Sequence, residues 1–188
     1  LSPEPSSGKS RALEVTEPLV PRPIHAVNVS PSYLFRKVSD PDGPPTVLYD
    51  EIDTVFGPKA KENEELRGLL NAGHRKGAFA GRCVIRGKNI ETEDFPAYCA
   101  VALAGLDDLP DTIMTRSVVV RMRRRAPGEI VAPWRLRVEK NSADALNDQL
   151  MQWSNQNQHT INTWPEMPQG VEDRNADVWE ALLAVADL

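Results

Sequence analysis

Two apolar runs of strand length constrain the fold of this 188-residue chain most, because neither alternates between apolar and polar residues. Residues 47–49 read Val-Leu-Tyr, and residues 99–104 read Cys-Ala-Val-Ala-Leu-Ala. A strand with one solvated face alternates, whereas a strand covered by helices on both faces does not. The two runs therefore predict a parallel sheet in the middle of an α/β fold.

The remaining pattern alternates between strand and helix signals, as expected for such a fold. Further strands are predicted at residues 24–29, 79–85 and 117–122, with a polar loop after the second of them that runs through Asp94. Helices are predicted at residues 11–15, 32–38 and 62–71, the second of them capped by Ser30 with Pro31 in its first turn. The chain has two cysteines, Cys83 and Cys99, without the spacing of a zinc site or a disulfide framework, and we expect both to be buried thiols.

After Pro133 the sequence pattern predicts helices rather than strands. We expect Ser142 to cap a helix that carries Leu146, Leu150 and Trp153, and Asp173 to cap another that carries Trp179 and Leu182. The expected organisation is an α/β core over residues 1–127 and a small C-terminal helical lid over residues 128–188.

Net charge and hydropathy argue against two classes of protein, highly basic proteins and membrane proteins. The net charge of −5 excludes a histone-like protein coated in positive charge, although basic residues cluster in residues 67–90 and 113–140. No apolar run reaches the roughly 18 residues of a membrane span, and the first residues lack the features of a secretory signal, so we expect a cytoplasmic protein without membrane contact. The lack of an initiating Met suggests a fragment of a longer protein.

The first candidate site is Ser7-Gly8-Lys9-Ser10, which leads into the first predicted helix. A phosphate chain needs backbone amides at a helix N-terminus, a lysine for the outer phosphates and a hydroxyl for Mg²⁺, and this segment supplies the end of such a loop. Pro3 stands where the usual first glycine falls, and Pro5 removes a second amide donor. A surface turn is the alternative interpretation.

The second candidate site is the acidic pair Asp50-Glu51, directly after the apolar run 47–49. A carboxylate at the end of a buried strand can hold Mg²⁺ while its neighbour polarises an attacking water. The alternative is a strand that ends in a solvated acidic loop.

Four segments together resemble a family of uncharacterised P-loop ATPase domains found in phages, plasmids and integrated elements. They are residues 5–10 (PSSGKS), 47–53 (VLYDEID), 69–77 (LLNAGHRKG) and 104–113 (AGLDDLPDTI), and residues 170–174 and 177–179 extend the resemblance to the end of the chain. The resemblance implies a P-loop NTPase fold of the AAA+ type, with ATP and Mg²⁺ as cofactors. It also implies a homo-oligomer such as a hexamer, single-stranded DNA as a partner and attachment to a primase-polymerase module.

The resemblance carries roles onto individual residues. Ser7, Gly8, Lys9 and Ser10 would hold the phosphates, Ser10 and Asp50 the Mg²⁺, and Glu51 the attacking water. Arg116 stands where an arginine finger would reach a neighbouring subunit, and Arg174 where a lid arginine would contact the nucleotide. An Arg116–Asp111 pair and an exposed pair of Asp173 with Arg174 are the structural alternatives. The second apolar run ends in Ala104-Gly105-Leu106, without the polar phosphate sensor usual at this point, and Asp107 is the nearest candidate.

Arg75 and Lys76 lie in a glycine-flanked basic turn that would contact a DNA backbone, with a solvated loop as the alternative. The sequence therefore predicts an Mg²⁺-dependent ATPase coupled to DNA, a helicase or translocase of a mobile element. Two other hypotheses stay open: a nucleotide-dependent assembly, defence or signalling switch that does not move along DNA, and a scaffold that binds nucleotide without hydrolysis.

Overall fold

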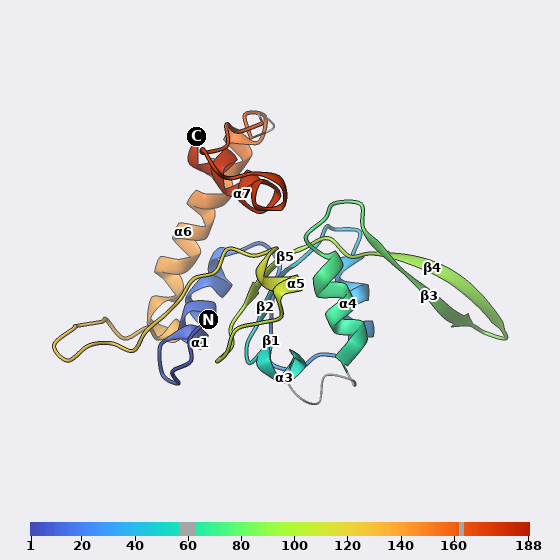
Figure 1. The fold of residues 1–188 in the computed structure, drawn as a ribbon, viewed down its shortest axis with the longest axis horizontal. Helices are drawn as coiled ribbons and strands as arrows, with labels where there is room; N and C mark the ends of the chain where they lie inside the picture. Colours follow the sequence, from blue (N-terminus) through green and yellow to red (C-terminus); the bar gives the residue numbers. More distant parts are fainter. Residues whose placement is uncertain (57–62, 162–163) are drawn as a thin grey trace.

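The computed structural model describes residues 1–56, 63–161 and 164–188, and its centre is a small parallel sheet. Strands β1 (Pro23–Ala26), β2 (Thr46–Tyr49) and β5 (Ala100–Leu103) lie in the order β1-β2-β5. Val47 of β2 is in register with Ile24 on one side and with Val101 on the other. Figure 1 shows helices around this sheet, and the expected mixed α/β fold with a parallel sheet is confirmed.

The central strand explains the first apolar run, because both of its faces are covered. Val47 and Tyr49 belong to the larger hydrophobic cluster, which also contains Phe35 of α2 (Pro31–Val38). Leu48 points to the opposite face, where it packs with Leu13 of α1 (Lys9–Thr16) and Ala104. All four residues of β2 are buried, as expected for a strand between two helical layers.

The remaining helices are short in the core and long at the C-terminus. They are η1 (Glu17–Leu19), α3 (Asp53–Phe56), α4 (Glu64–Ala72), α5 (Asp111–Met114), α6 (Leu136–Asn157) and α7 (Asp173–Ala186). Helix α2 begins as predicted, because Ser30 Oγ accepts a hydrogen bond from Tyr33 N at 3.3 Å and Pro31 occupies the first turn. The predicted helix 62–71 corresponds to α4, although Glu62 lies outside the described residues.

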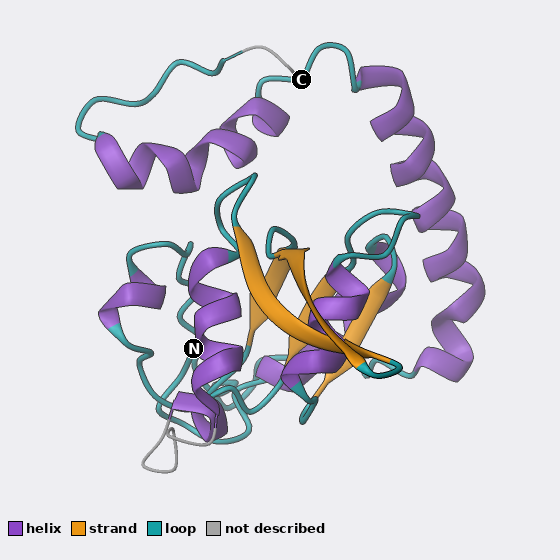
Figure 2. Cartoon of the chain, turned by 90° about the vertical axis from the view of Figure 1, so that its right-hand side faces the viewer, coloured by secondary structure: helices purple, strands orange, loops and turns teal. Residues whose placement is uncertain are grey.

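Residues 79–96 differ from the prediction, because they form a separate hairpin. Strand β3 (Phe79–Arg86) pairs antiparallel with β4 (Asn89–Pro96), whose first six residues we expected to lie in a polar loop. The hairpin projects from the core beside α4 (Figures 1 and 2). Its base is fixed by Arg82, which bonds Glu65 at 2.7 Å and lies over the ring of Phe35. Cys83 is exposed on this hairpin, so its predicted burial was wrong, whereas Cys99 is buried.

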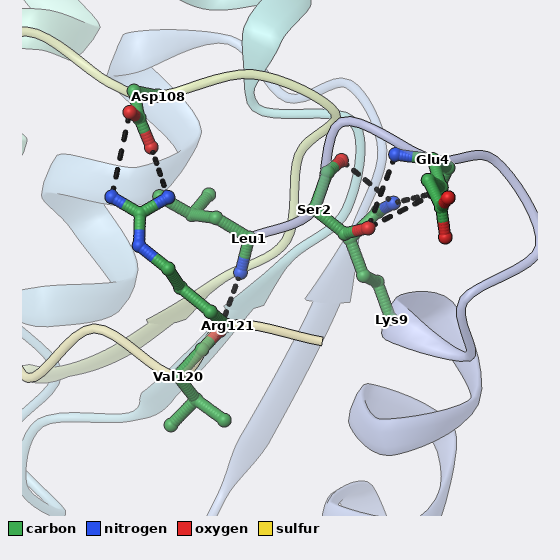
Figure 3. Close-up of polar contacts among 7 residues, drawn as sticks. All are labelled: Leu1, Ser2, Glu4, Lys9, Asp108, Val120 and Arg121. Atoms are coloured by element: carbon green, nitrogen blue, oxygen red, sulfur yellow. Dashed lines mark hydrogen bonds and ion pairs between the residues drawn. The ribbon is translucent and has the colours of Figure 1, made fainter. Parts of the chain in front are cut away.

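The strand predicted at residues 117–122 is absent, although the segment is extended beside Leu1. The N-terminal ammonium of Leu1 donates to Val120 O at 2.8 Å (Figure 3). Met122 N donates to Leu1 O at 3.0 Å. These two bonds have the pattern of a parallel ladder between Leu1 and this segment.

The C-terminal helices extend away from the sheet. Helix α6 begins at Leu136, six residues before the predicted cap Ser142. It contacts η1, and near its middle Asn147 Nδ2 donates to Pro18 O at 2.6 Å. Figures 1 and 2 both place α7 beyond the opposite end of α6. The predicted division between residues 127 and 128 stays a prediction, because residues 120–135 also touch the core. Among the described helices, none combines the length and apolar character needed to cross a bilayer.

Candidate nucleotide site

The loop before α1 leaves the first amides of that helix without helical partners. Gly8 takes the left-handed conformation with φ 89°, and Ser6 takes φ 61°. The first hydrogen bond of the helix runs from Ala12 N to Gly8 O at 2.9 Å, and no side chain caps the N-terminus. The N–H groups of Lys9, Ser10 and Arg11 therefore lie ahead of the helical hydrogen bonding. Such amides, together with the helix dipole, favour an anion.

The side chain of Lys9 folds back into the same loop. Its Nζ donates to Ser2 O at 3.2 Å, to Glu4 O at 3.0 Å and to Ser7 Oγ at 3.1 Å, as Figure 3 shows for the first two residues. These three acceptors are uncharged oxygens, so none of them neutralises the ammonium. A phosphate oxygen that entered the loop would offer Lys9 a stronger, charge-assisted partner.

The acidic pair follows directly after the buried strand β2. Asp50 N donates to Ala26 O at 2.8 Å, which continues the ladder by one step, and Asp50 Oδ1 accepts from Glu51 N at 2.9 Å. Glu51 is exposed and takes φ 53°, a region that costs a non-glycine residue about 1 to 3 kcal/mol. The strained turn leaves the Glu51 carboxylate in solvent and leaves Asp50 half-buried at the strand end.

Three hydrogen bonds join this acidic turn to the start of the loop. Ile52 N donates to Ala104 O at 3.0 Å, and Leu106 N donates to Asp53 Oδ1 at 3.1 Å. Ser2 N in turn donates to Gly105 O at 3.4 Å. The turn after β2, the turn after β5 and the entry to the loop therefore lie in a row at the carboxyl edge of the sheet, the usual edge for ligand sites in parallel sheets.

The basic segment 121–125 lies against the loop, and three of its arginines bond other residues of the chain. Arg124 donates from Nε to Pro5 O at 2.7 Å and from its main-chain N to Glu4 Oε2 at 3.1 Å. Arg121 pairs with Asp108 at 2.9 Å (Figure 3), and Arg123 pairs with Glu129. Hydrogen bonds from Arg123 and from Ala126 N hold the pKa of the exposed Glu129 at about 2. Arg124 therefore ties this segment to the loop, whereas Arg121 and Arg123 pair with carboxylates outside it.

The two predicted arginine contacts have separate places in the fold. Arg116 follows α5 and donates from Nη1 to Thr112 O at 2.5 Å, rather than to the carboxylate of Asp111. Its Nε is buried without a hydrogen-bond partner. Arg174 is exposed in the first turn of α7, at the opposite end of the molecule from the loop before α1 (Figures 1 and 2). The structure therefore does not bring Arg174 to Lys9.

Arg75 and Lys76 lie at the base of the β3–β4 hairpin. They line an open surface depression together with Gly77, Ala78 and Phe79. The ring of Phe79 is 63% exposed, although it begins a strand. The sequence predicts only the start of a strand at Phe79, and no local signal separates an exposed ring from a buried one at that position.

The described residues contain no group of three or more His, Cys, Asp or Glu side chains that is suited to a metal ion. Mg²⁺ does not require one, because it is commonly held by one or two protein oxygens together with substrate phosphates and water. The exposed hydroxyl of Ser10 and the half-buried carboxylate of Asp50 are oxygen donors of this kind. Their chemistry fits Mg²⁺ that arrives with a phosphate chain.

Comparison with known proteins finds a family and a relative that each match part of the chain. Residues 121–188 match a family described as "Protein of unknown function (DUF3631)". A 67-residue stretch is 46% identical to an "Uncharacterized 28.9 kDa protein in xis 5′ region" of Saccharopolyspora erythraea. The match covers 35% of this chain and 25% of that relative. No solved structure matches the chain significantly. The loop and the acidic pair lie outside the residues that match the family, so their interpretation rests on geometry.

Proposed function

We propose that the protein binds ATP together with Mg²⁺ at residues 6–10 and hydrolyses it. The observation that carries the proposal is the row of hydrogen bonds from the turn after β2, through Gly105, to Ser2. It brings the acidic turn and the lysine loop to one edge of a parallel sheet, although 40 residues separate Ser10 from Asp50. The loop offers an uncapped helix N-terminus and an unneutralised lysine, which suit the phosphates. The acidic turn offers two carboxylates, which suit Mg²⁺ and the attacking water.

The roles follow from the chemistry of each side chain. Gly8 and the amides of Ser7, Lys9 and Ser10 would surround the phosphates, and the Lys9 ammonium would exchange its loop oxygens for phosphate oxygens. Ser10 and Asp50 would supply protein oxygens to Mg²⁺, which balances charge on the phosphates. Glu51, exposed on its strained turn, would orient the attacking water. Arg116 would act in a homo-oligomer, where it would reach the nucleotide of a neighbouring subunit.

A coupling to single-stranded DNA is the second part of the proposal, and Phe79 supports it. An exposed aromatic ring beside Arg75 and Lys76 combines a stacking surface for a base with two cations for phosphates. This combination suits the helicase or translocase role that the sequence resemblance implies, in company with a primase-polymerase module. A nucleotide-dependent assembly or signalling switch would not need this surface.

The deciding experiment is ATP hydrolysis by the full-length protein, with and without single-stranded DNA, at a stated salt concentration. Lys9→Ala should abolish nucleotide binding, and Glu51→Gln should retain binding and lose turnover. Lys37→Ala and Glu166→Gln, at exposed positions outside the site, are the matched controls. Combined Arg75→Ala, Lys76→Ala and Phe79→Ala substitutions should remove the stimulation by DNA and leave the basal rate unchanged.

Other outcomes separate the alternatives. Turnover that does not respond to DNA would favour the switch, and tight ATP binding without turnover would favour the non-hydrolysing scaffold. Turnover that survives both Lys9→Ala and Glu51→Gln would place the activity elsewhere.

A further inference from the structure

An open cavity of about 630 Å³ lies between the first turn of α1 and the segment that leads into α6. This volume falls in the range of roughly 300 to 1,000 Å³ that small-molecule sites occupy. The cavity is lined by Arg11, Arg125, Val131, Ala132, Pro133, Trp134 and Arg135. None of the residues assigned to the phosphates or to Mg²⁺ belongs to this lining.

The lining combines a flat aromatic ring and apolar side chains with three cations. Val131, Ala132 and Pro133 precede the indole of Trp134, while Arg11, Arg125 and Arg135 bring positive charge. A lining of this kind suits a ligand with an aromatic ring and negative charge. No carboxylate belongs to this lining, although Arg11 pairs with Glu14 of α1, so Arg125 and Arg135 carry the charge that is available to such a ligand.

The cavity borders the loop that holds Lys9 through two of its lining residues, Arg11 and Arg125. Arg11 comes directly after Ser10, in the first turn of α1, and its Nη1 donates to Trp134 O at 3.0 Å. On the other side, Arg124 bonds Pro5 O of the loop and is followed in the chain by Arg125. The N–H of Arg11 is also one of the three amides that lie ahead of the helical hydrogen bonding in α1, so the cavity borders the helix N-terminus where the phosphates would bind. A ligand held at these amides can therefore extend into the cavity.

We propose that this cavity binds the base and ribose of the nucleotide whose phosphates lie in the loop, with the indole of Trp134 as the stacking surface. The inference rests on the proposed nucleotide function and adds to it the residue that recognises the base. Arg11 is a positioning residue, since its bond to the Trp134 carbonyl fixes that segment against α1. A nucleic-acid strand is the competing occupant. The position of the cavity next to the phosphate loop favours a mononucleotide.

The test compares the binding of ATP with that of inorganic tripolyphosphate, both with Mg²⁺, by isothermal titration calorimetry on the full-length protein. Trp134→Leu should weaken ATP binding by about tenfold, the usual cost of losing one aromatic–base stack, and leave tripolyphosphate binding unchanged. Trp134→Phe keeps a flat ring and should restore most of the ATP affinity. Trp164→Leu, at a tryptophan that is 74% exposed and outside the cavity, should change neither affinity.

The outcomes distinguish this inference from the proposed function. If the wild-type protein binds both ligands and Trp134→Leu leaves ATP binding intact, the base site is overturned and the phosphate site stands. An equal loss of ATP and tripolyphosphate affinity in Trp134→Leu overturns it as well, because the substitution then acts on the loop. A wild-type protein that binds neither ligand overturns the nucleotide function itself. Trp134-dependent binding of an oligonucleotide, with ATP binding unaffected, would assign the cavity to nucleic acid instead.

Discussion

Asp53 Oδ1 accepts a hydrogen bond from the main-chain N–H of Leu106 at 3.1 Å, across 53 positions of the sequence. This bond joins the turn after β2 to the turn after β5 at the edge of the sheet where the candidate site lies. Beyond the paired residues of β2 and β5, the Asp53 carboxylate therefore takes the place of a main-chain acceptor. The acidic turn is consequently held against its neighbour, although Glu51 within it is strained.

Gly105 is the residue that permits this close approach. A Cβ at this position would lie 3.0 Å from Ile52 Cγ2 and 3.1 Å from Asp53 Oδ1, and Ile52 is fully buried and has no room to move. We expect Gly105→Ala to lower the free energy of unfolding by about 1 to 3 kcal/mol, as overpacked cores do. Urea denaturation measures the change. Gly68→Ala is the matched control, because nothing lies within 4 Å of that Cβ and α4 should gain about 0.5 to 1 kcal/mol.

Ser30 tests the local rule that predicted α2. Its Oγ accepts the hydrogen bond from Tyr33 N, and Ser30→Ala should therefore cost about 1 kcal/mol of stability. Ser30→Asp retains a capping oxygen and should stay close to the wild-type protein. Thermal unfolding of the two variants gives the comparison, and a Ser30→Ala variant as stable as the wild-type protein would show that the cap contributes nothing.

The elements that could be predicted are those whose signal is local. The run at β2 is apolar because Leu48 faces α1 while Val47 and Tyr49 face the other helical layer, so the pattern reports two covered faces. The cap at Ser30 and the glycine before Lys9 are recognised within a few residues of sequence. For the same reason the sequence alone assigns the carboxylates after β2 to the end of a strand.

The elements that could not be predicted depend on distant partners. Strand β4 resembles a loop in sequence because its residues up to Asp94 bury almost nothing, and only its pairing with β3 makes it a strand. Residues 117–122 do not form the predicted strand, although Leu1 bonds them in the pattern of a parallel ladder. In the site, Arg124 contacts Pro5 across 119 positions, and Trp134 reaches Arg11 across 123. No spacing in the sequence signals these contacts.

The two cysteines should differ sharply in reactivity. Burial raises the pKa of the Cys99 thiol to about 11, whereas Cys83 is exposed on the hairpin. Because the thiolate is the reactive species, a disulfide reagent at pH 8 should modify Cys83 quickly and Cys99 only after denaturation. Mass spectrometry of the modified peptides reads out the two sites. Rapid modification of Cys99 in the folded protein would contradict the assignment.

The raised pKa of Cys99 also predicts a pH dependence of stability. The folded state keeps the thiol proton up to about pH 11, while the unfolded chain loses it near the ordinary value of 9.0. Unfolding therefore releases a proton between these pH values, and stability falls as the pH rises through this window. The loss should be on the order of 2 kcal/mol at pH 10.5. Cys99→Ala should lack this part of the pH dependence, which urea denaturation of both proteins at pH 8 and pH 10.5 can isolate.

Arg124 offers the most direct test of how the loop before α1 is held. Arg124→Ala removes the 2.7 Å bond to Pro5 O and keeps the main-chain bond to Glu4, so the loop should open locally while the fold persists. We expect the amides of residues 6–8 to exchange with deuterium about tenfold faster, in line with the loss of one charge-assisted hydrogen bond. Lys140→Ala is the control, because its partner Asp144 lies in α6, outside the loop, and exchange at residues 6–8 should stay unchanged. If ATP slows exchange at residues 6–8 in the wild-type protein and less so in Arg124→Ala, the same bond also prepares the loop for its ligand.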